Sequence, residues 1–238
     1  IGQLFKNVFF LIHSFCNFLA FHCNIFTYVS NLIFQILEHL MSITIMKFGG
    51  TSVANLNRIK KAAKTVKSKI IDEKQKIVVV VSAMSGVTNN LVEGFNKISD
   101  NINNPEYDLI LSTGEQYSSG LMSTVLNKIG IKSRSLLGWQ IPILTDNNYS
   151  KARINSISSA KIKKLFKSFD ALVIAGFQGL SEENRITTLG RGGSDTTAVA
   201  LAVATKSNNC EIFTDVEGIF SSDPKIVKNA KKIKKITY

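Results

Sequence analysis

The chain has 238 residues, a hydrophobic fraction of 45% and a formal net charge of +12, and the roughly 190 residues from Met46 onward are enough to bury the core of one domain. The positive charge suggests a nucleic-acid partner, but the lysines are spread along expected helix faces and no basic platform with interleaved aromatic residues is present, so a nucleic-acid-binding domain is the weaker alternative. The three cysteines form neither a disulfide framework nor a CxxC metal site, which suits a reducing cytosol.

The first 40 residues differ from the rest of the sequence. They contain no methionine and carry no charge between Lys6 and Glu38, so the stretch is long enough to span a bilayer. Polar residues interrupt it, however, and it has neither a cleavage site nor a basic n-region. We interpret residues 1–40 as an apolar leader that is not part of the native protein, with a membrane anchor as the alternative.

A strand, a glycine loop and a helix are predicted over residues 45–66. A short apolar run ends at Lys47 and is followed by Gly49 and Gly50. The apolar positions of the following helix are expected on one face, at Leu56, Ile59, Ala63 and Val66. The lysine precedes the glycines, so this is not a Walker A loop. Backbone amides beside glycine can still approach phosphate oxygens and Lys47 supplies a point charge, which makes the loop a candidate anion site.

Two segments further along the chain carry isolated polar residues. Residues 76–90 begin as a continuous β-branched run, which predicts a strand buried on both faces, and continue into a small-residue loop with Ser82 and Thr88. Residues 109–126 have a largely helical pattern that contains Glu115. For each of these three residues alone, helix capping or a solvated face is about as plausible as a function. Their positions near strand ends favour a functional role.

The segment 188–204 is a glycine-rich turn that leads directly into an apolar helix. Backbone amides at a helix start can hold a phosphate or carboxylate. Arg191 can add a bidentate fork for a carboxylate, and Asp195 can hold an ammonium group or orient a lysine. The alternative is purely structural, with the glycines making a tight turn and Ser194 or Asp195 capping the helix. Two glycine loops on one sheet predict two anionic substrates.

A last strand is predicted at the start of residues 209–227. It is followed by a loop with Thr214 and Asp215. Loops of this kind, at the ends of strands, line ligand clefts in open α/β sheets.

Five motifs, in this order and spacing, resemble the aspartokinases of the amino-acid kinase superfamily: KFGGTSV, VVSAMSGVTN, LSTGE, GRGGSD and TDVEGIFSSDP. The resemblance covers residues 41–238. It implies a cytoplasmic enzyme that uses ATP to phosphorylate the side-chain carboxylate of L-aspartate to 4-phospho-L-aspartate, the first step of lysine, threonine and methionine biosynthesis. It also implies a three-layer α/β/α sandwich with a mainly parallel open sheet, and a homo-oligomer in the full-length protein.

The resemblance also assigns roles to individual residues. Lys47 and Asp195 would be catalytic, with Asp195 organising Lys47. The L-aspartate pocket would comprise Ser82, Thr88, Glu115, Arg191 and Ser194, with Arg191 on the α-carboxylate and Glu115 on the α-ammonium group. ATP would lie along Lys47, Phe48, Gly49, Gly50, Thr214, Asp215, Phe220 and Lys225. The family commonly has tyrosine in place of Phe220 and arginine in place of Lys225, so a hydroxyl contact and a bidentate phosphate fork are lost here.

The expected chemistry agrees with the absence of histidine after Met41. A carboxylate nucleophile with a pKa of about 4 is already ionised at neutral pH, so its phosphorylation needs no general base. Positioning and charge neutralisation suffice. Magnesium is expected with the nucleotide as part of the substrate, and no permanently bound metal is expected.

Compared with aspartokinases, residues 41–238 are expected to form a catalytic domain that is incomplete at its C-terminus and lacks the ACT regulatory modules. Other members of the superfamily remain as alternatives, namely a uridylate kinase or an acetylglutamate kinase. A further alternative is the kinase part of an aspartokinase fused to a homoserine dehydrogenase.

Overall fold

The computed structural model of the chain describes residues 43–215, 218, 221–222 and 226–233. The expected leader, residues 1–40, lies outside the described residues, as do two of the predicted nucleotide-binding residues, Phe220 and Lys225. Within the described part of the chain, no helix is both long and apolar enough to cross a membrane.

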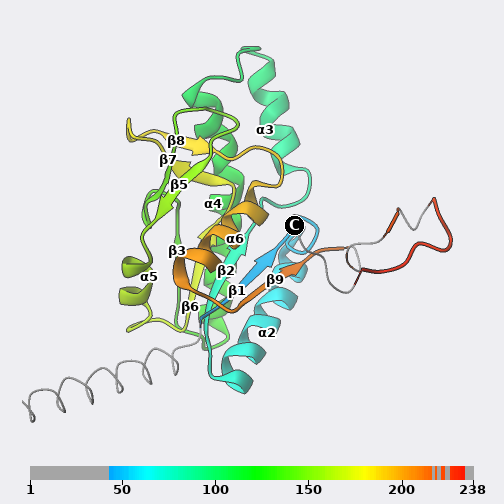
Figure 1. Cartoon of the computed structure of the whole chain (residues 1–238), viewed down its shortest axis with the longest axis vertical. Coiled ribbons are helices and arrows are strands. Elements are labelled where there is room, and N and C mark those ends of the chain that lie inside the picture. Colours follow the sequence, from blue (N-terminus) through cyan, green and yellow to red (C-terminus); the bar gives the residue numbers. More distant parts are fainter. Residues whose placement is uncertain (1–42, 216–217, 219–220, 223–225, 234–238) are drawn as a thin grey trace, which may run out of the picture. The chain divides into compact units, whose positions relative to one another are not determined.

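A parallel sheet of five strands forms the centre of the domain, in the order β3-β6-β2-β1-β9 (Figure 1). Its strands in chain order are β1 (Ile43–Phe48), β2 (Lys76–Val81), β3 (Ser133–Leu136), β6 (Ala171–Ala175) and β9 (Asn209–Phe213). All four pairings in this sheet are parallel, so the strands end at one common edge. The prediction of a mainly parallel open sheet is confirmed.

The β-branched run predicted as a strand buried on both faces is β2. Its side chains alternate between two hydrophobic clusters: Ile77, Val79 and Val81 pack on one face, while Val78 and Val80 pack on the other. All five are fully buried. A strand with both faces covered needs apolar side chains at consecutive positions, which explains the unbroken run.

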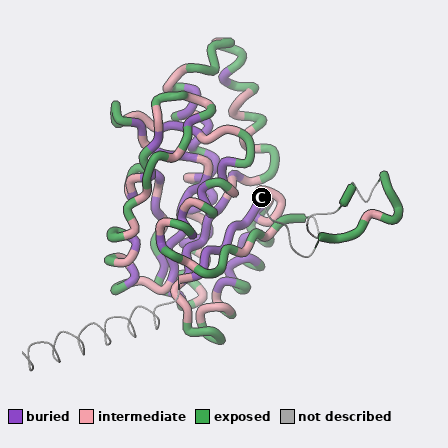
Figure 2. The backbone as a smooth tube through the Cα atoms, in the orientation of Figure 1, coloured by how far each residue is buried: buried purple, intermediate pink, exposed green. Residues whose placement is uncertain are grey.

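Helices cover both faces of this sheet. One cluster contains residues of α2 (Leu56–Glu73) and α4 (Pro105–Lys128), and the opposite cluster contains residues of α5 (Ser159–Leu165) and α6 (Gly193–Thr205). Buried residues concentrate along the central strands and the helix faces turned toward them (Figure 2). The three-layer α/β/α sandwich is therefore confirmed. A further helix, α3 (Val87–Asn96), packs on α4 through Phe95, Tyr107 and Leu111.

A second sheet of four short strands was not predicted. It has the order β5-β4-β7-β8 and consists of β4 (Ile143–Thr145), β5 (Ile154–Ile157), β7 (Gln178–Leu180) and β8 (Ile186–Thr188). These strands are three or four residues long, too short for a period-2 pattern to stand out. The sheet matters for the site because β8 leads directly into the glycine-rich turn that precedes α6.

Two details of the predicted helices are corrected by the structure. Leu56 was placed on the buried face of its helix but is 53% exposed, and Ala62 is buried on that face. The helical pattern predicted for residues 109–126 begins earlier in the structure, because α4 starts at Pro105. Asn104 caps this helix by accepting a hydrogen bond from the Glu106 N–H at 2.8 Å, and proline is well tolerated at the first helical position.

Two glycines in α4 allow a matched test of this packing. A Cβ added at Gly114 would lie 2.8 Å from the Ala83 Cβ, whereas one added at Gly120 would meet nothing within 4 Å. We expect Gly114→Ala to lower the free energy of unfolding by about 1–3 kcal/mol through overpacking. Gly120→Ala should raise it by about 0.5–1 kcal/mol, because alanine favours the helix. Urea unfolding of both variants measures these changes. Changes of the same sign in the free energy of unfolding would contradict the packing described.

Candidate functional site

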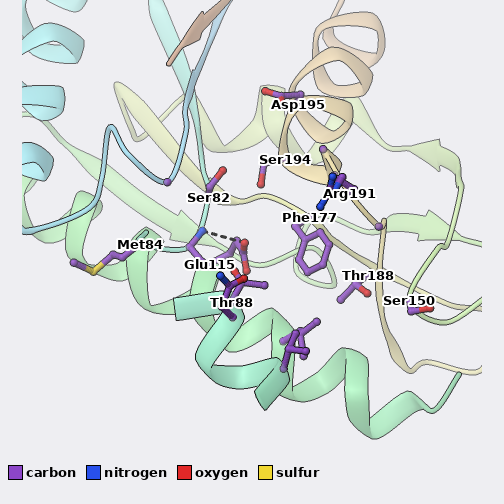
Figure 3. Close-up of a pocket in the computed structure, with 18 of the residues that line it drawn as sticks. Ser82, Met84, Thr88, Glu115, Ser150, Phe177, Thr188, Arg191, Ser194 and Asp195 are labelled. Carbon is purple, nitrogen blue, oxygen red and sulfur yellow. Dashed lines mark hydrogen bonds between the residues drawn. The ribbon is translucent and has the colours of Figure 1, made fainter. Parts of the chain in front are cut away.

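The carboxyl ends of the parallel strands form the floor of a cavity of about 630 Å³ (Figure 3). Because the strands run in one direction, the segments that follow β1, β2 and β6 emerge at the same edge of the sheet. Eight of the residues predicted from the sequence line this cavity: Lys47, Gly50, Ser82, Thr88, Glu115, Arg191, Ser194 and Asp195. The structure thus brings together residues from four separate segments of the chain.

The two residues assigned to catalysis are in contact. Lys47 is the penultimate residue of β1, and its Nζ lies 2.7 Å from Oδ1 of Asp195 in the first turn of α6. The lysine side chain is only 8% exposed, whereas that of Asp195 is 46% exposed. This ion pair connects the glycine loop after β1 to the helix that follows the glycine-rich turn.

The three residues after Lys47 differ in what they offer a ligand. The Phe48 ring is buried and stacks on Phe213, with ring centroids 4.7 Å apart. The Gly49 N–H donates to the Phe213 carbonyl at 3.0 Å, so this amide is already used by the sheet. Gly50 lines the cavity, and a Cβ there would lie 3.0 Å from the Ala83 carbonyl oxygen. Of the three, only Gly50 faces the cavity.

Glu115 is a buried carboxylate in the wall of the cavity. Its residue is 4% exposed, and Oε1 accepts a hydrogen bond from the Ala83 N–H at 3.0 Å. The other oxygen, Oε2, is buried and has no hydrogen-bond partner among the described residues. Burial raises the pKa of Glu115 to about 7, although backbone hydrogen bonds partly oppose this shift. A carboxylate with a free buried oxygen would bind a cationic group strongly.

The glycine-rich turn presents Arg191 to the same cavity. Gly190 and Gly192 have φ of 77° and 76°, which glycine adopts without strain, and α6 begins at the next residue. The Gly193 N–H donates to Gly190 and the Asp195 N–H donates to Gly192. Because these two amides already have acceptors inside the turn, fewer backbone N–H groups are free to bind an anion than the glycine pattern suggested. The Arg191 side chain makes no ion pair with any described residue.

Several cavity residues were missed by the sequence reasoning. Ser150, Lys151, Phe177 and Thr188 also line the cavity, and Figure 3 shows three of them around the same space as Arg191. Phe177 and Ser150 have φ of 67° and 66°, a left-handed conformation that is costly for residues other than glycine. No composition or periodicity signal marks such positions, because the surrounding fold imposes their conformation.

Thr214 and Asp215, which were predicted to contact ATP, do not line the cavity. Thr214 and Asp215 follow β9 and are exposed, and the Thr214 hydroxyl donates to the Asp215 carboxylate at 3.1 Å. They emerge beside the Gly49 segment, because β9 pairs with β1 and Phe213 lies next to Phe48 in register. Among the described residues, no group of three His, Cys, Asp or Glu side chains could hold a metal ion.

Comparison with known families matches residues 42–238 to the amino acid kinase family. Among relatives, the aspartokinase of Rickettsia felis is 52% identical over 202 residues, which are 83% of this chain and 50% of that protein. The chain spans about half the length of the curated relatives it matches.

Among solved structures, the chain is likewise similar to aspartate kinases. The crystal structure of aspartate kinase from Synechocystis has a TM-score of 0.67 and 42% identity, and the match covers 80% of this chain and 31% of that one. The structure of E. coli aspartokinase III in complex with aspartate and ADP has a TM-score of 0.69 and 27% identity, covering 80% of this chain and 53% of that one.

The buried Glu115 makes stability depend on pH. Its pKa is raised from 4.5 to about 7 in the folded protein, so the folded state binds the proton more tightly and stability falls as pH rises through this interval. Glu115→Gln keeps the shape and removes the charge. We expect the variant to be more stable than the wild type at pH 8, by on the order of 2–3 kcal/mol, with little of this advantage at pH 5.

Urea unfolding at both pH values measures the difference. Glu93→Gln is the matched control, because Glu93 is exposed on α3 and its replacement should change stability by less than about 0.5 kcal/mol. A Glu115→Gln variant no more stable than the wild type at pH 8 would show that burial of this carboxylate costs nothing.

Proposed function

The chain belongs to the amino acid kinase family, and we propose that it transfers the γ-phosphoryl group of ATP to the side-chain carboxylate of L-aspartate. The product would be 4-phospho-L-aspartate, at the first step of lysine, threonine and methionine biosynthesis. The aspartokinases and aspartate kinases among its relatives support this proposal, as does the complex of E. coli aspartokinase III with aspartate and ADP.

One observation carries the choice of acceptor: the cavity is lined by both a buried carboxylate and an unpaired guanidinium group. Glu115 keeps one buried oxygen without a partner, and Arg191 makes no ion pair among the described residues. An α-amino acid is a zwitterion with one group of each sign. Arg191 would bind the α-carboxylate in a bidentate manner, and Glu115 would bind the α-ammonium group.

The same observation discriminates against the rival acceptors. Neither N-acetylglutamate nor UMP carries an ammonium group, so either would leave the Glu115 carboxylate buried without a cation. An unpaired buried charge is costly, and a site built around a polar partner rejects analogues that lack it. Glu115 therefore favours an acceptor with a free α-amino group over the acetylglutamate kinase and uridylate kinase alternatives.

The phosphoryl side of the proposal rests on Lys47. An oxygen of the acceptor carboxylate would attack the γ-phosphorus as the bond to the ADP oxygen breaks, and negative charge would spread over the transferring group. The Lys47 ammonium, held 2.7 Å from Asp195, would stabilise that charge. The acceptor carboxylate is already ionised at neutral pH, so no proton has to be removed.

Some parts of the proposal rest on the resemblance to the family. These are binding of ATP along Thr214 and Asp215, entry of Mg²⁺ with the nucleotide, a cytoplasmic location and a homo-oligomeric state. Gly50 would approach the phosphates from the cavity side, whereas Gly49, whose amide is already hydrogen-bonded to Phe213, would act only by leaving space.

The proposal is tested by the identity of the acceptor. With MgATP, the protein should form an acyl phosphate from L-aspartate, which hydroxylamine traps as the hydroxamate. N-acetyl-L-aspartate keeps both carboxylates but lacks the ammonium group that Glu115 would pair. Its kcat/KM should be at least about 100-fold lower, the scale on which sites with buried polar partners reject analogues.

UMP and N-acetylglutamate serve as further acceptors, with ADP release as the common readout. Turnover of either at a rate equal to or above that of L-aspartate would overturn the assignment. Equal turnover of N-acetyl-L-aspartate and L-aspartate would keep the reaction class but remove Glu115 from acceptor recognition.

A further inference from the structure

We propose that Asp108 is a positioning residue that sets the spacing between Glu115 and Arg191, and therefore determines how tightly the zwitterionic acceptor binds. This inference rests on the proposed function, because it assigns the two ends of the acceptor to these two side chains. Asp108 itself does not line the cavity. It lies in the first turn of α4 and is fully buried.

The Asp108 carboxylate fastens two cavity-lining segments to α4. Its oxygens accept hydrogen bonds from the Thr188 N–H at 2.7 Å and the Thr188 hydroxyl at 2.8 Å. They also accept from the Ser150 N–H, at 2.9 and 3.0 Å to the two oxygens. Every one of these partners is a donor, and no cation is involved. A deprotonated carboxylate can accept all of these bonds, whereas an amide cannot.

Both segments lead to the turn that carries Arg191. Thr188 ends β8, two residues before Gly190. Ser150 reaches the same glycine from the other side, because a Cβ at Gly190 would lie 3.3 Å from the Ser150 carbonyl oxygen. The Thr188 carbonyl also accepts a hydrogen bond from the Ala152 N–H at 2.9 Å, which ties the two segments to each other. Arg191 follows Gly190 directly in the chain, so both segments support the residue that precedes it.

Ser150 needs such an anchor. Its φ of 66° is a left-handed conformation, which costs a residue other than glycine about 1 kcal/mol or more and persists only where the surroundings hold it. The bifurcated hydrogen bond from its N–H to Asp108 supplies that restraint. Without it, we expect the segment at Ser150 to relax and the support for Gly190 to weaken.

Asp108 and Glu115 lie on the same helix, seven residues apart, and both are buried. Seven residues are about two helical turns, or about 10 Å along the axis, so the two side chains lie on one face. Helix α4 thus holds Glu115 directly and holds the Arg191 turn through Asp108. The separation of the two acceptor-binding groups is fixed by a rigid element rather than by a loop, and small misplacements of such groups are costly.

The test is Asp108→Asn in the full chain, with steady-state kinetics for L-aspartate and ATP. The asparagine NH₂ would face at least one backbone donor, so the Arg191 turn should loosen. We expect the KM for L-aspartate to rise by at least about tenfold while kcat and the KM for ATP change by less than about threefold. In the ligand-free variant, amide hydrogen exchange at Thr188 and Ser150 should also accelerate by at least about tenfold.

Asp146→Asn is the matched control. Asp146 accepts hydrogen bonds from the Asn148 N–H at 3.2 Å and the Arg153 N–H at 3.1 Å in the same loop, but it does not line the cavity. Its KM for L-aspartate should stay within about twofold of the wild type. Thr188→Val, which removes the hydroxyl hydrogen bond to Asp108, should raise the KM for L-aspartate by a smaller factor than Asp108→Asn does.

The proposal fails if Asp108→Asn leaves the KM for L-aspartate unchanged, if both Michaelis constants rise together, or if Asp146→Asn has the same effect. Should Asp108→Asn not fold, Thr188→Val decides, because the proposal fails if this variant leaves both the KM for L-aspartate and the hydrogen exchange at Ser150 unchanged. A wild-type protein that does not turn over L-aspartate would overturn the proposed function. In that case the hydrogen-exchange result would still show whether Asp108 holds the two segments.

Discussion

The site is organised around the ion pair between Lys47 and Asp195, which joins the end of β1 to the start of α6. The lysine side chain is 8% exposed, and burial of an ammonium group is unfavourable unless it has a charged partner. Asp195 meets this requirement from the first turn of α6, where the helix dipole also favours a carboxylate. The two glycine segments, each unremarkable alone, are therefore fixed relative to each other. The parallel register of the sheet makes this contact geometrically available.

Several features of the site oppose stability. Glu115 is a buried carboxylate with an unpaired oxygen, and Ser150 and Phe177 hold left-handed backbone conformations. Apolar packing elsewhere offsets these costs, above all in the central strands β2 and β6, where every residue but Lys76 is buried. Proteins commonly concentrate strain and unpaired polar groups where a ligand later satisfies them. The cavity wall of this domain follows that pattern.

The sequence predicted the parts of the fold whose signal is local. The β-branched run of residues 77–81 identifies a doubly covered strand, and the glycines before α6 identify a sharp turn that leads into a helix. The second sheet was missed because its strands are three or four residues long. Asp108 was missed because an aspartate in the first turn of a helix is ordinarily a solvated residue that favours the dipole. Its burial follows from long-range contacts with Ser150 and Thr188, which no local pattern encodes.

The candidate site could also be predicted from the sequence only in part. Motif positions identified residues from distant segments that line one cavity, since parallel strands bring their ends together. The use of individual backbone amides was not predictable: whether Gly49 or Gly50 faces a ligand depends on the pairing of Phe48 and Phe213 in register. Neighbouring glycines in a motif can therefore have different roles.

If Lys47 and Asp195 act as one unit, a double-mutant cycle on kcat should show that their effects are not additive. We would measure L-aspartate phosphorylation by Lys47→Met, Asp195→Asn and the double variant under saturating substrates. We expect each single change to lower kcat by about 100-fold or more. The kcat of the double variant should lie within about tenfold of that of the less active single variant. Losses that multiply in the double variant, or an Asp195→Asn protein with the kcat of the wild type, would contradict this coupling.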